Sequence, residues 1–140
     1  MSNRPPRGTV LIVDDEESVR ALLRRQLNSA GHTVLEAGSG PEALGLVRQR
    51  AERLDLVLSD VVMPAMNGTE LAAHLATEFP RLPVVLMSAY APAGLARVGF
   101  GEAIVPVLRK PFDPALLLDL VRTAIERPRG PSGSEAAATR

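Results

Sequence analysis

The sequence predicts an α/β domain in which helices cover a five-stranded parallel sheet. Five short aliphatic runs alternate along the chain with segments whose apolar residues recur at helical spacing. The connections are short, and a strand-helix-strand unit of this kind forms a right-handed crossover between parallel strands. With 140 residues, the chain is long enough for one domain with a full core.

Each predicted strand is a short run of Val, Leu and Ile that ends at polar residues, as expected for strands buried on both faces of a sheet. Pro106 interrupts the last run. Because proline cannot donate a hydrogen bond to a neighbouring strand, we place this strand at an edge of the sheet. In chain order the predicted strands are Thr9–Val13, Thr33–Ala37, Leu54–Asp60, Pro83–Met87 and Ile104–Leu108.

Helical segments are predicted between the strands from apolar spacing and capping residues. In the first helix, Arg20 and Arg24 are expected to face solvent, and Gly31 ends the helix in the left-handed conformation. Asp113 is a good N-cap for the last helix. The segment 91–101 carries Gly and Pro, so any helix there is short and is the least ordered element. The other predicted helices span 17–30, about 41–53, 69–79 and the residues from 114 onward.

The composition excludes several classes of function. The formal net charge is zero, which disfavours binding to nucleic acid or to an anionic membrane, and the absence of Cys excludes disulfides and thiolate metal sites. No apolar stretch approaches the ~18 residues of a membrane span, and the N-terminus lacks the apolar core of a signal peptide. We therefore expect a cytoplasmic protein. His32 and His74 have no second ligand at metal spacing and are predicted to be exposed.

Polar residues stand at the carboxyl ends of four predicted strands: Asp14 and Asp15, then Asp60, Ser88 and Lys110. In a parallel sheet these ends lie at one edge, where ligands of open α/β sheets bind. If these strands are neighbours, the side chains converge on one pocket.

The residue types in this set favour phosphoryl chemistry. Three carboxylates need a counter-charge, and the natural one is a hard divalent cation such as Mg²⁺ bound by oxygens. Lys110 is the only lysine among 16 basic residues, and its compact ammonium suits a site for a single phosphoryl group. An acid at the centre of such a site can attack phosphorus and form an acyl phosphate.

The same residues carry a resemblance to a known family. Over about residues 8–127 the chain resembles the receiver domain of two-component response regulators. The resemblance implies a flavodoxin-like sheet of strand order 2-1-3-4-5 with five surrounding helices. The segments 88–90 and 110–112 are most similar to receivers of hybrid histidine kinases or of stand-alone regulators. The matching positions are Asp14-Asp15, Asp60 with Pro64 and Gly68, Ser88-Ala89, and Lys110-Pro111.

The resemblance implies a role for each site residue. Asp60 is the phosphoacceptor, Lys110 pairs with a phosphate oxygen, and Ser88 turns its hydroxyl onto the phosphoryl group. Asp15, Asp60 and the backbone carbonyl of Val62 bind Mg²⁺ directly, whereas Asp14 acts through water. The donor is a phosphohistidine on a histidine kinase or phosphotransfer protein. The chain is then a signalling phosphoacceptor that assists its own phosphorylation and dephosphorylation, and not an enzyme.

One position departs from the family pattern. Three residues before the lysine, receivers usually carry a Tyr or Phe that rotates inward, and here that residue is Val107. Tyr90 is the only tyrosine of the chain and lies two residues after Ser88. Our hypothesis is that Tyr90 takes over part of the switch or shields the phosphoryl group from water.

Three other functions fit parts of the pattern. A flavin or nucleotide binder shares the fold but needs a phosphate loop where residues 14–17 are acidic. A haloacid dehalogenase-type phosphatase needs a second acid at Val62 and a cap domain. A degenerate receiver that acts only as a docking scaffold is the strongest rival, and the complete set of acid, hydroxyl and lysine disfavours it.

The expected domain organisation is a flexible lead (1–7), a receiver domain (8–127) and a disordered tail (128–140). No helix-turn-helix or basic patch follows the last helix, so output is expected through protein binding or relay of the phosphoryl group to another histidine. We expect a monomer or weak dimer. The sequence leaves open whether the chain is a complete regulator or part of a hybrid kinase.

Overall fold

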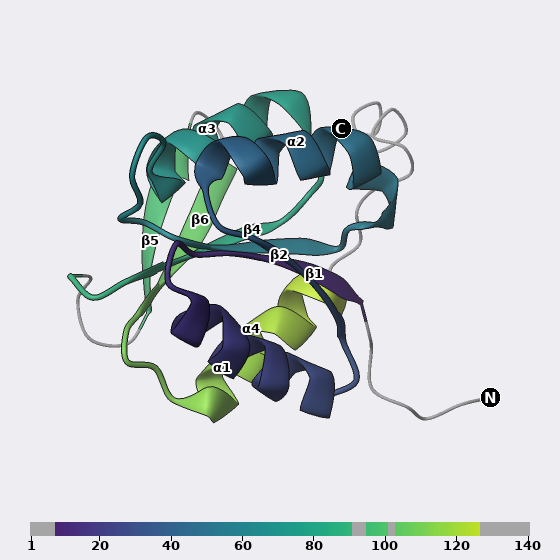
Figure 1. The fold of residues 1–140 in the computed structure, drawn as a ribbon, viewed down its shortest axis with the longest axis vertical. Helices are drawn as coiled ribbons and strands as arrows, with labels where there is room; N and C mark the ends of the chain where they lie inside the picture. Colours follow the sequence, from purple (N-terminus) through teal and green to yellow (C-terminus); the bar gives the residue numbers. More distant parts are fainter. Residues whose placement is uncertain (1–7, 91–94, 101–102, 127–140) are drawn as a thin grey trace.

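A six-stranded sheet forms the middle layer of the molecule, with helices on both faces (Figure 1). The computed structural model describes residues 8–90, 95–100 and 103–126, so the predicted lead and tail lie outside the described residues. The strands are β1 (Thr9–Val13), β2 (Thr33–Ala37), β3 (Leu56–Asp60), β4 (Val84–Ser88), β5 (Leu95–Phe100) and β6 (Ala103–Arg109). The helices are α1 (Glu17–Ser29), α2 (Gly40–Arg50), α3 (Gly68–Glu78) and α4 (Pro114–Glu126), with a 3₁₀ turn, η1 (Ala51–Arg53).

The strand order is β2-β1-β3-β4-β6-β5, and every pair except β5 with β6 is parallel. The five parallel strands therefore follow the predicted order 2-1-3-4-5, which confirms the flavodoxin-like fold. This order makes β1, β3, β4 and β6 four successive neighbours, with β3 and β4 at the centre. The carboxyl ends of these four strands lie along one edge of the sheet, as the sequence analysis requires.

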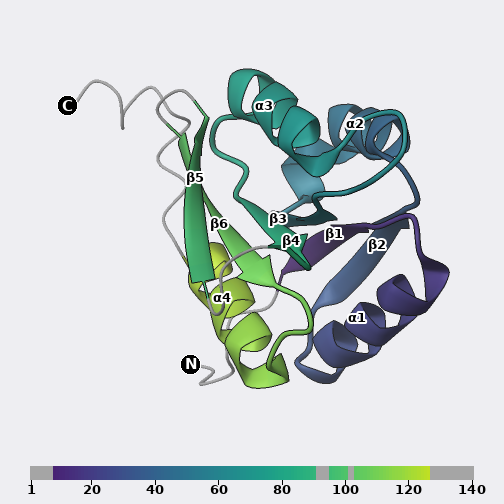
Figure 2. The same cartoon turned by 90° about the vertical axis from the view of Figure 1, so that its left-hand side faces the viewer.

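The segment before β6 differs from the prediction. Where a short fifth helix was expected, β5 forms a hairpin with β6 and becomes the edge strand (Figure 2). The described residues therefore contain four α-helices and not five. The placement of the Ile104–Leu108 strand at the edge was wrong, because β6 pairs with β4 on one side and with β5 on the other. The parallel ladder of β6 with β4 begins only at Val107, so the missing N–H of Pro106 falls outside it; Pro106 lies opposite Arg97 in the antiparallel pairing with β5.

Two aliphatic cores lie on the two faces of the sheet. Alternate residues of β1 point to opposite faces, so Leu11 and Val13 pack with α2 and α3, whereas Val10 and Ile12 pack with α1 and α4 (Figure 1). Each such side chain, when fully buried, stabilises the fold by roughly 1.5–3 kcal/mol relative to its exposed state. Both faces of the central strands are therefore covered, and the polar residues at the strand ends are the part of these strands that can form a functional site.

Local signals in the sequence set several element ends. Gly31 has a φ of 96° after α1, as predicted for its position. The Oδ1 atom of Asp113 accepts the N–H of Ala115 at 3.0 Å at the start of α4. Asn67 and Glu70 form a capping box that starts α3 at Gly68.

The exposure predicted for His32 was wrong. His32 is buried, with 5% of its surface exposed, and its Nδ1 atom lies 3.2 Å from the Gly8 N–H that donates to it. This contact joins residues 24 positions apart, so it could not be read from local pattern. Within the described residues, no helix has both the length and the apolar character needed to cross a membrane.

Candidate functional site

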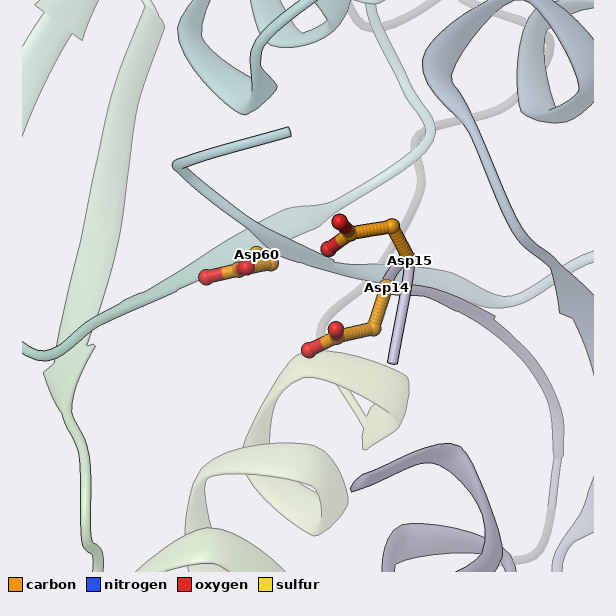
Figure 3. Close-up of side chains that lie close together, drawn as sticks. All are labelled: Asp14, Asp15 and Asp60. Atoms are coloured by element: carbon orange, nitrogen blue, oxygen red, sulfur yellow. The ribbon is translucent and has the colours of Figure 1, made fainter. Parts of the chain in front are cut away.

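Three aspartates meet where β1 and β3 end. Asp14 and Asp15 directly follow β1, and Asp60 is the last residue of β3, the strand that pairs with β1. Each of the three offers a carboxylate oxygen, and these oxygens lie within 4.8 Å of one another. Figure 3 shows the three side chains together at this edge. Asp14 is fully buried and Asp60 is 7% exposed, so Asp60 is more enclosed than a position on an open sheet edge would be.

Backbone and side-chain hydrogen bonds hold Asp14 in place. Its Oδ1 atom accepts the N–H of Glu16 at 2.9 Å, and its own N–H donates to the carbonyl of Ala37 on β2 at 3.2 Å. Its other carboxylate oxygen, Oδ2, lies 3.3 Å from Nζ of Lys110. The contacts with Glu16 and Lys110 set the direction of the carboxylate, and the contact with Ala37 holds the backbone.

Lys110 joins the two buried acids. It follows β6, and its Nζ atom lies 3.2 Å from Oδ1 of Asp60 as well as 3.3 Å from Asp14. Burial alone would lower the pKa of Lys110, but the charges of Asp14 and Asp60 outweigh burial and hold the pKa above its ordinary value. Lys110 is therefore charged at neutral pH and neutralises part of the acidic cluster.

The environment of Asp60 disfavours its charge. Burial raises the pKa of Asp60 above its ordinary value; the Lys110 ammonium opposes this rise, and the nearby Asp14 carboxylate adds to it. Three carboxylates face one ammonium, so negative charge is in excess at this edge. The donors are all hard oxygens, and the surplus charge favours a divalent cation. The residues present thus fit the magnesium ion that the sequence analysis predicts.

Glycine lets the loop after β3 close tightly over Asp60. A Cβ atom on Gly68 would lie 2.1 Å from the carbonyl oxygen of Asp60, a distance that no side chain can occupy. The N–H of Gly68 donates to the carbonyl of Val61 at 2.8 Å. Val62, the predicted carbonyl ligand, lies in this loop, and its side chain is exposed. The loop thus depends on glycine at position 68 because of space and not because of backbone torsion.

Ser88 ends β4, one residue beyond the Asp60–Met87 pair of the ladder. It is 7% exposed, and its Oγ atom accepts the N–H of Tyr90 at 3.0 Å. The backbone N–H of Lys110 donates to the carbonyl of Ser88 at 2.9 Å, which ties the ends of β4 and β6 together. The structure therefore places the predicted hydroxyl and lysine on neighbouring strand ends.

Tyr90 is the predicted residue that the structure does not bring into the cluster. Its surface is 85% exposed, and its contact with the site is through its backbone N–H. Val107 is buried on β6 against Leu86 and Ala72, so it has neither the size nor the freedom to rotate as an aromatic residue would.

Arg20 is a residue of the site that the sequence pattern did not predict. This residue was expected to face solvent, but its guanidinium reaches the backbone carbonyl of Asp14 at 2.6 Å and the carboxylate of Glu36 on β2 at 3.1 Å. Its spacing gives a partial signal, since it lies one turn into the helix that follows the paired acids. The partner on β2 could not be found from spacing alone.

A hollow of about 950 Å³ lies elsewhere and has a different character. It is lined by residues 48–53, which precede β3, and by residues 78–82, which precede β4, so it is at the opposite edge of the sheet from Asp60. Arginines near the carboxyl ends of α2 and η1 offset the negative end of the helix dipole there.

Comparison with known proteins agrees with this geometry. Residues 10–122 match the family described as "Response regulator receiver domain". The chain is 40% identical over 120 residues to the sensor kinase CckA of Brucella abortus, a match that covers 86% of this chain and 13% of that protein. It is 38% identical over 112 residues to the response regulator protein FleR of Pseudomonas aeruginosa, covering 80% of this chain and 23% of that protein. This chain thus spans less than a quarter of either relative.

Solved structures show the same fold. The crystal structure of the receiver domain from the hybrid histidine kinase CckA superposes with a TM-score of 0.72 at 34% identity, covering 85% of this chain and all of that one. Receiver domains are signalling phosphoacceptors that bind Mg²⁺ at an acidic pocket and interact with histidine kinases or phosphotransfer proteins. The matched segment contains the Asp14, Asp60 and Lys110 cluster described above, and this chain belongs to the response regulator receiver domain family.

Proposed function

We propose that this chain accepts a phosphoryl group from a phosphohistidine on Asp60 and thereby switches its protein contacts. One observation carries the proposal: Nζ of Lys110 lies 3.2 Å from Asp60 and 3.3 Å from Asp14, with Asp15 in the same cluster. Such a set supplies a nucleophile, cation ligands and a counter-charge, which are the parts that phosphoryl transfer to a carboxylate needs.

In the transfer step, a carboxylate oxygen of Asp60 attacks phosphorus while the P–N bond of the phosphohistidine breaks. The imidazole nitrogen keeps the electron pair and takes a proton from solvent. Lys110 stabilises negative charge on the phosphoryl oxygens, and it also favours the ionised form of Asp60 against the effect of burial. In a separate hydrolysis step, water attacks phosphorus and loses a proton to solvent, the bond between phosphorus and the Asp60 oxygen breaks, and the Asp60 carboxylate and inorganic phosphate are released.

The acidic oxygens form the cation site in this proposal. Asp15, Asp60 and the backbone carbonyl of Val62 hold Mg²⁺, and Asp14 contributes through water. A bound Mg²⁺ ion neutralises charge on the transferring phosphoryl oxygens. The oxygen-only ligand set and the excess of carboxylates over ammonium groups support this assignment.

We further propose that the switch begins at Ser88. Its Oγ atom now accepts the N–H of Tyr90, and turning the hydroxyl onto a phosphoryl group weakens that bond. The added charge of about −1.5 to −2 gives the hydroxyl and Lys110 a new acceptor. Movement at Tyr90 would then alter the face formed by β5, β6 and α4, where we place the partner. Val107 is buried, whereas Tyr90 is an exposed aromatic residue whose N–H already bonds to Ser88, which supports this role.

The donor and the output belong to the same proposal. The likeness to a sensor kinase and to a response regulator supports a histidine kinase or phosphotransfer protein as the donor. The proposed output is protein binding, or relay of the phosphoryl group to a second histidine. Relay requires that the acyl phosphate on Asp60 remains reactive.

Intact-mass measurement after incubation with acetyl phosphate and Mg²⁺ tests the proposal. The wild-type protein should gain one phosphoryl group that is labile to acid and base, and EDTA should prevent the gain. Asp60→Asn should abolish it, whereas Asp119→Asn, a change at an exposed position of α4, should have no effect. A wild-type protein without the gain, or an Asp60→Asn variant that retains it, would overturn the assignment.

A further inference from the structure

Arg20 connects the acidic cluster to the neighbouring strand. Its Nη1 atom donates to the backbone carbonyl of Asp14 at 2.6 Å, and its Nε atom lies 3.1 Å from Oε1 of Glu36 on β2. The Arg20 side chain is 18% exposed, so these contacts are shielded from water. One guanidinium thus spans the end of β1, the first turns of α1 and β2.

The carbonyl that Arg20 holds belongs to the peptide bond between Asp14 and Asp15. A peptide unit is planar, so fixing its carbonyl also fixes the orientation of the Asp15 N–H and limits the torsions on either side. Those torsions decide where the Asp14 and Asp15 carboxylates point. A charge-assisted hydrogen bond from a guanidinium is among the stronger restraints a side chain can place on backbone.

Glu36 in turn holds Arg20. Burial raises the pKa of Glu36, but hydrogen bonds and charges from Arg24 and Arg20 outweigh burial, and the pKa is lowered overall. Arg24, one turn further along α1, pairs with the other Glu36 oxygen. Arg24 therefore shares Glu36 with Arg20. Among the arginines whose contacts are described, Arg20 is the one that contacts Asp14.

We propose that Arg20 is a positioning residue for the cation site, which orients the Asp14–Asp15 peptide so that both carboxylates face the same point. The inference rests on the proposed function, because it takes the acidic cluster to be the Mg²⁺ site. Beyond the proposed function, the inference gives a role to Arg20 on α1 and to its partner Glu36 on β2, which are not ligands of the cation.

The sign of the effect on Mg²⁺ affinity separates this role from two simpler ones. If Arg20 acted only as a positive charge near the acids, its removal would tighten Mg²⁺ binding. If it were only a salt bridge between α1 and β2, its removal would lower stability and leave affinity unchanged. A positioning role predicts weaker binding, and loss of such outer contacts typically weakens metal binding by about 10- to 100-fold.

Isothermal titration of Mg²⁺ into the wild type, Arg20→Ala, Arg20→Lys and Arg24→Ala tests the proposal. We expect Arg20→Ala to bind about 10-fold more weakly. Arg20→Lys should also weaken binding, because one ammonium cannot hold both partners at the geometry of the guanidinium fork. Arg24→Ala should bind as the wild type does. Unchanged or tighter binding by Arg20→Ala, or wild-type binding by Arg20→Lys, would overturn the proposal.

Phosphorylation by acetyl phosphate at increasing Mg²⁺ provides a second readout. Arg20→Ala should need more Mg²⁺ for half-maximal rate and should approach the wild-type rate at saturation. A lower maximal rate with an unchanged Mg²⁺ requirement would contradict positioning. If the wild type gains no phosphoryl group, the proposed function fails, whereas normal phosphorylation with the same Mg²⁺ requirement in both proteins refutes only the role of Arg20.

Discussion

The two sides of the candidate site are held in different ways. On the acidic side, which comprises the ends of β1 and β2 and the start of α1, Asp14 bonds to Glu16, Ala37 and Arg20. On the lysine side, which comprises the ends of β4 and β6, Ser88 bonds through its side chain to the nearby N–H of Tyr90. Lys110 is held by attraction to the acids across the site.

This difference indicates which side of the site can rearrange at a low cost in free energy. The restraints on Asp14 come from two other elements, α1 with its N-cap residue and β2, so the direction of the Asp14 carboxylate is set by contacts outside its own strand. The side-chain contacts on the lysine side are either local or directed at charges that a cation or a phosphoryl group would alter. We infer that the acidic side sets the chemistry and that the lysine side carries the response. Five predictions test this division, from the largest expected effect to the smallest.

Removal of the lysine should have the largest effect. Lys110→Met should lower the rate of phosphorylation by acetyl phosphate by about 10²-fold or more, since it removes a preorganised charge from the site. The rate of phosphoryl gain by intact mass measures this. Arg109→Met, one residue earlier and exposed, is the matched control and should keep the wild-type rate. Equal rates for both variants would show that the lysine side has no part in the transfer.

Gly68→Ala should perturb the backbone that carries Asp60. The added Cβ would lie 2.1 Å from the Asp60 carbonyl, so the loop must shift, at a cost of about 1–3 kcal/mol in the free energy of unfolding. Gly45→Ala is the control, because nothing lies within 4 Å of its Cβ. In the helix interior that change should stabilise by about 0.5–1 kcal/mol. Urea unfolding curves distinguish the two, and equal stabilities would contradict the close approach.

The pH dependence of stability should reveal the buried charge of Asp60. Since the pKa of Asp60 is raised in the folded state, folding disfavours its ionised form. Its contribution to stability therefore falls as the pH rises from about 3.9, the unfolded value, through the raised folded value. Asp60→Asn should be more stable than wild type at pH 7 in EDTA, and the gain should vanish below about pH 4.

Lys110 gives the same direction of change at alkaline pH. Its raised pKa means that its contribution is complete below about pH 10.4 and is lost as the pH rises through the folded value. Urea unfolding in the acidic and the alkaline pH range, with and without Mg²⁺, measures the contributions of Asp60 and Lys110 to the free energy of unfolding. An Asp60→Asn variant that is less stable than wild type in EDTA at pH 7 would show that attraction to Lys110 exceeds the cost of burial.

Tyr90→Ala should have the smallest effect on the fold. Its side chain is 85% exposed, so the free energy of unfolding should change by less than about 0.5 kcal/mol. The lifetime of the phosphoryl group or the affinity for a partner should change if Tyr90 takes part in the switch, and Tyr90→Phe should preserve both. No change in either property with Tyr90→Ala would remove Tyr90 from the response.

The sequence predicted most of the parallel sheet because each strand carries its own signal. Thr9–Val13 and Thr33–Ala37 have the predicted bounds, and Asp60 ends β3 as its position after the apolar run indicated. Caps at Asp113 and Gly31 are local as well, since their hydrogen bonds and torsions involve residues close in sequence. The polar residues at these ends could be predicted to share an edge because parallel strands point the same way.

Contacts between distant residues were decided only by the tertiary structure. Lys110 and Asp14 are 96 positions apart, and Arg20 on α1 contacts Glu36 on β2. The periodicity of the sequence predicts neither of these two contacts. The same holds for β5, since Leu95–Phe100 lacks a strong local preference and becomes a strand by pairing with β6.

The sequence by itself determined which chemical groups stand at the strand ends, because local pattern specifies where a strand stops. The fold decided how those groups meet: the burial of Asp60, the position of the ammonium between two acids, and the guanidinium that holds the Asp14 carbonyl. The physical reason is that burial and charge balance depend on neighbours supplied by other strands and helices, which no single stretch of sequence contains.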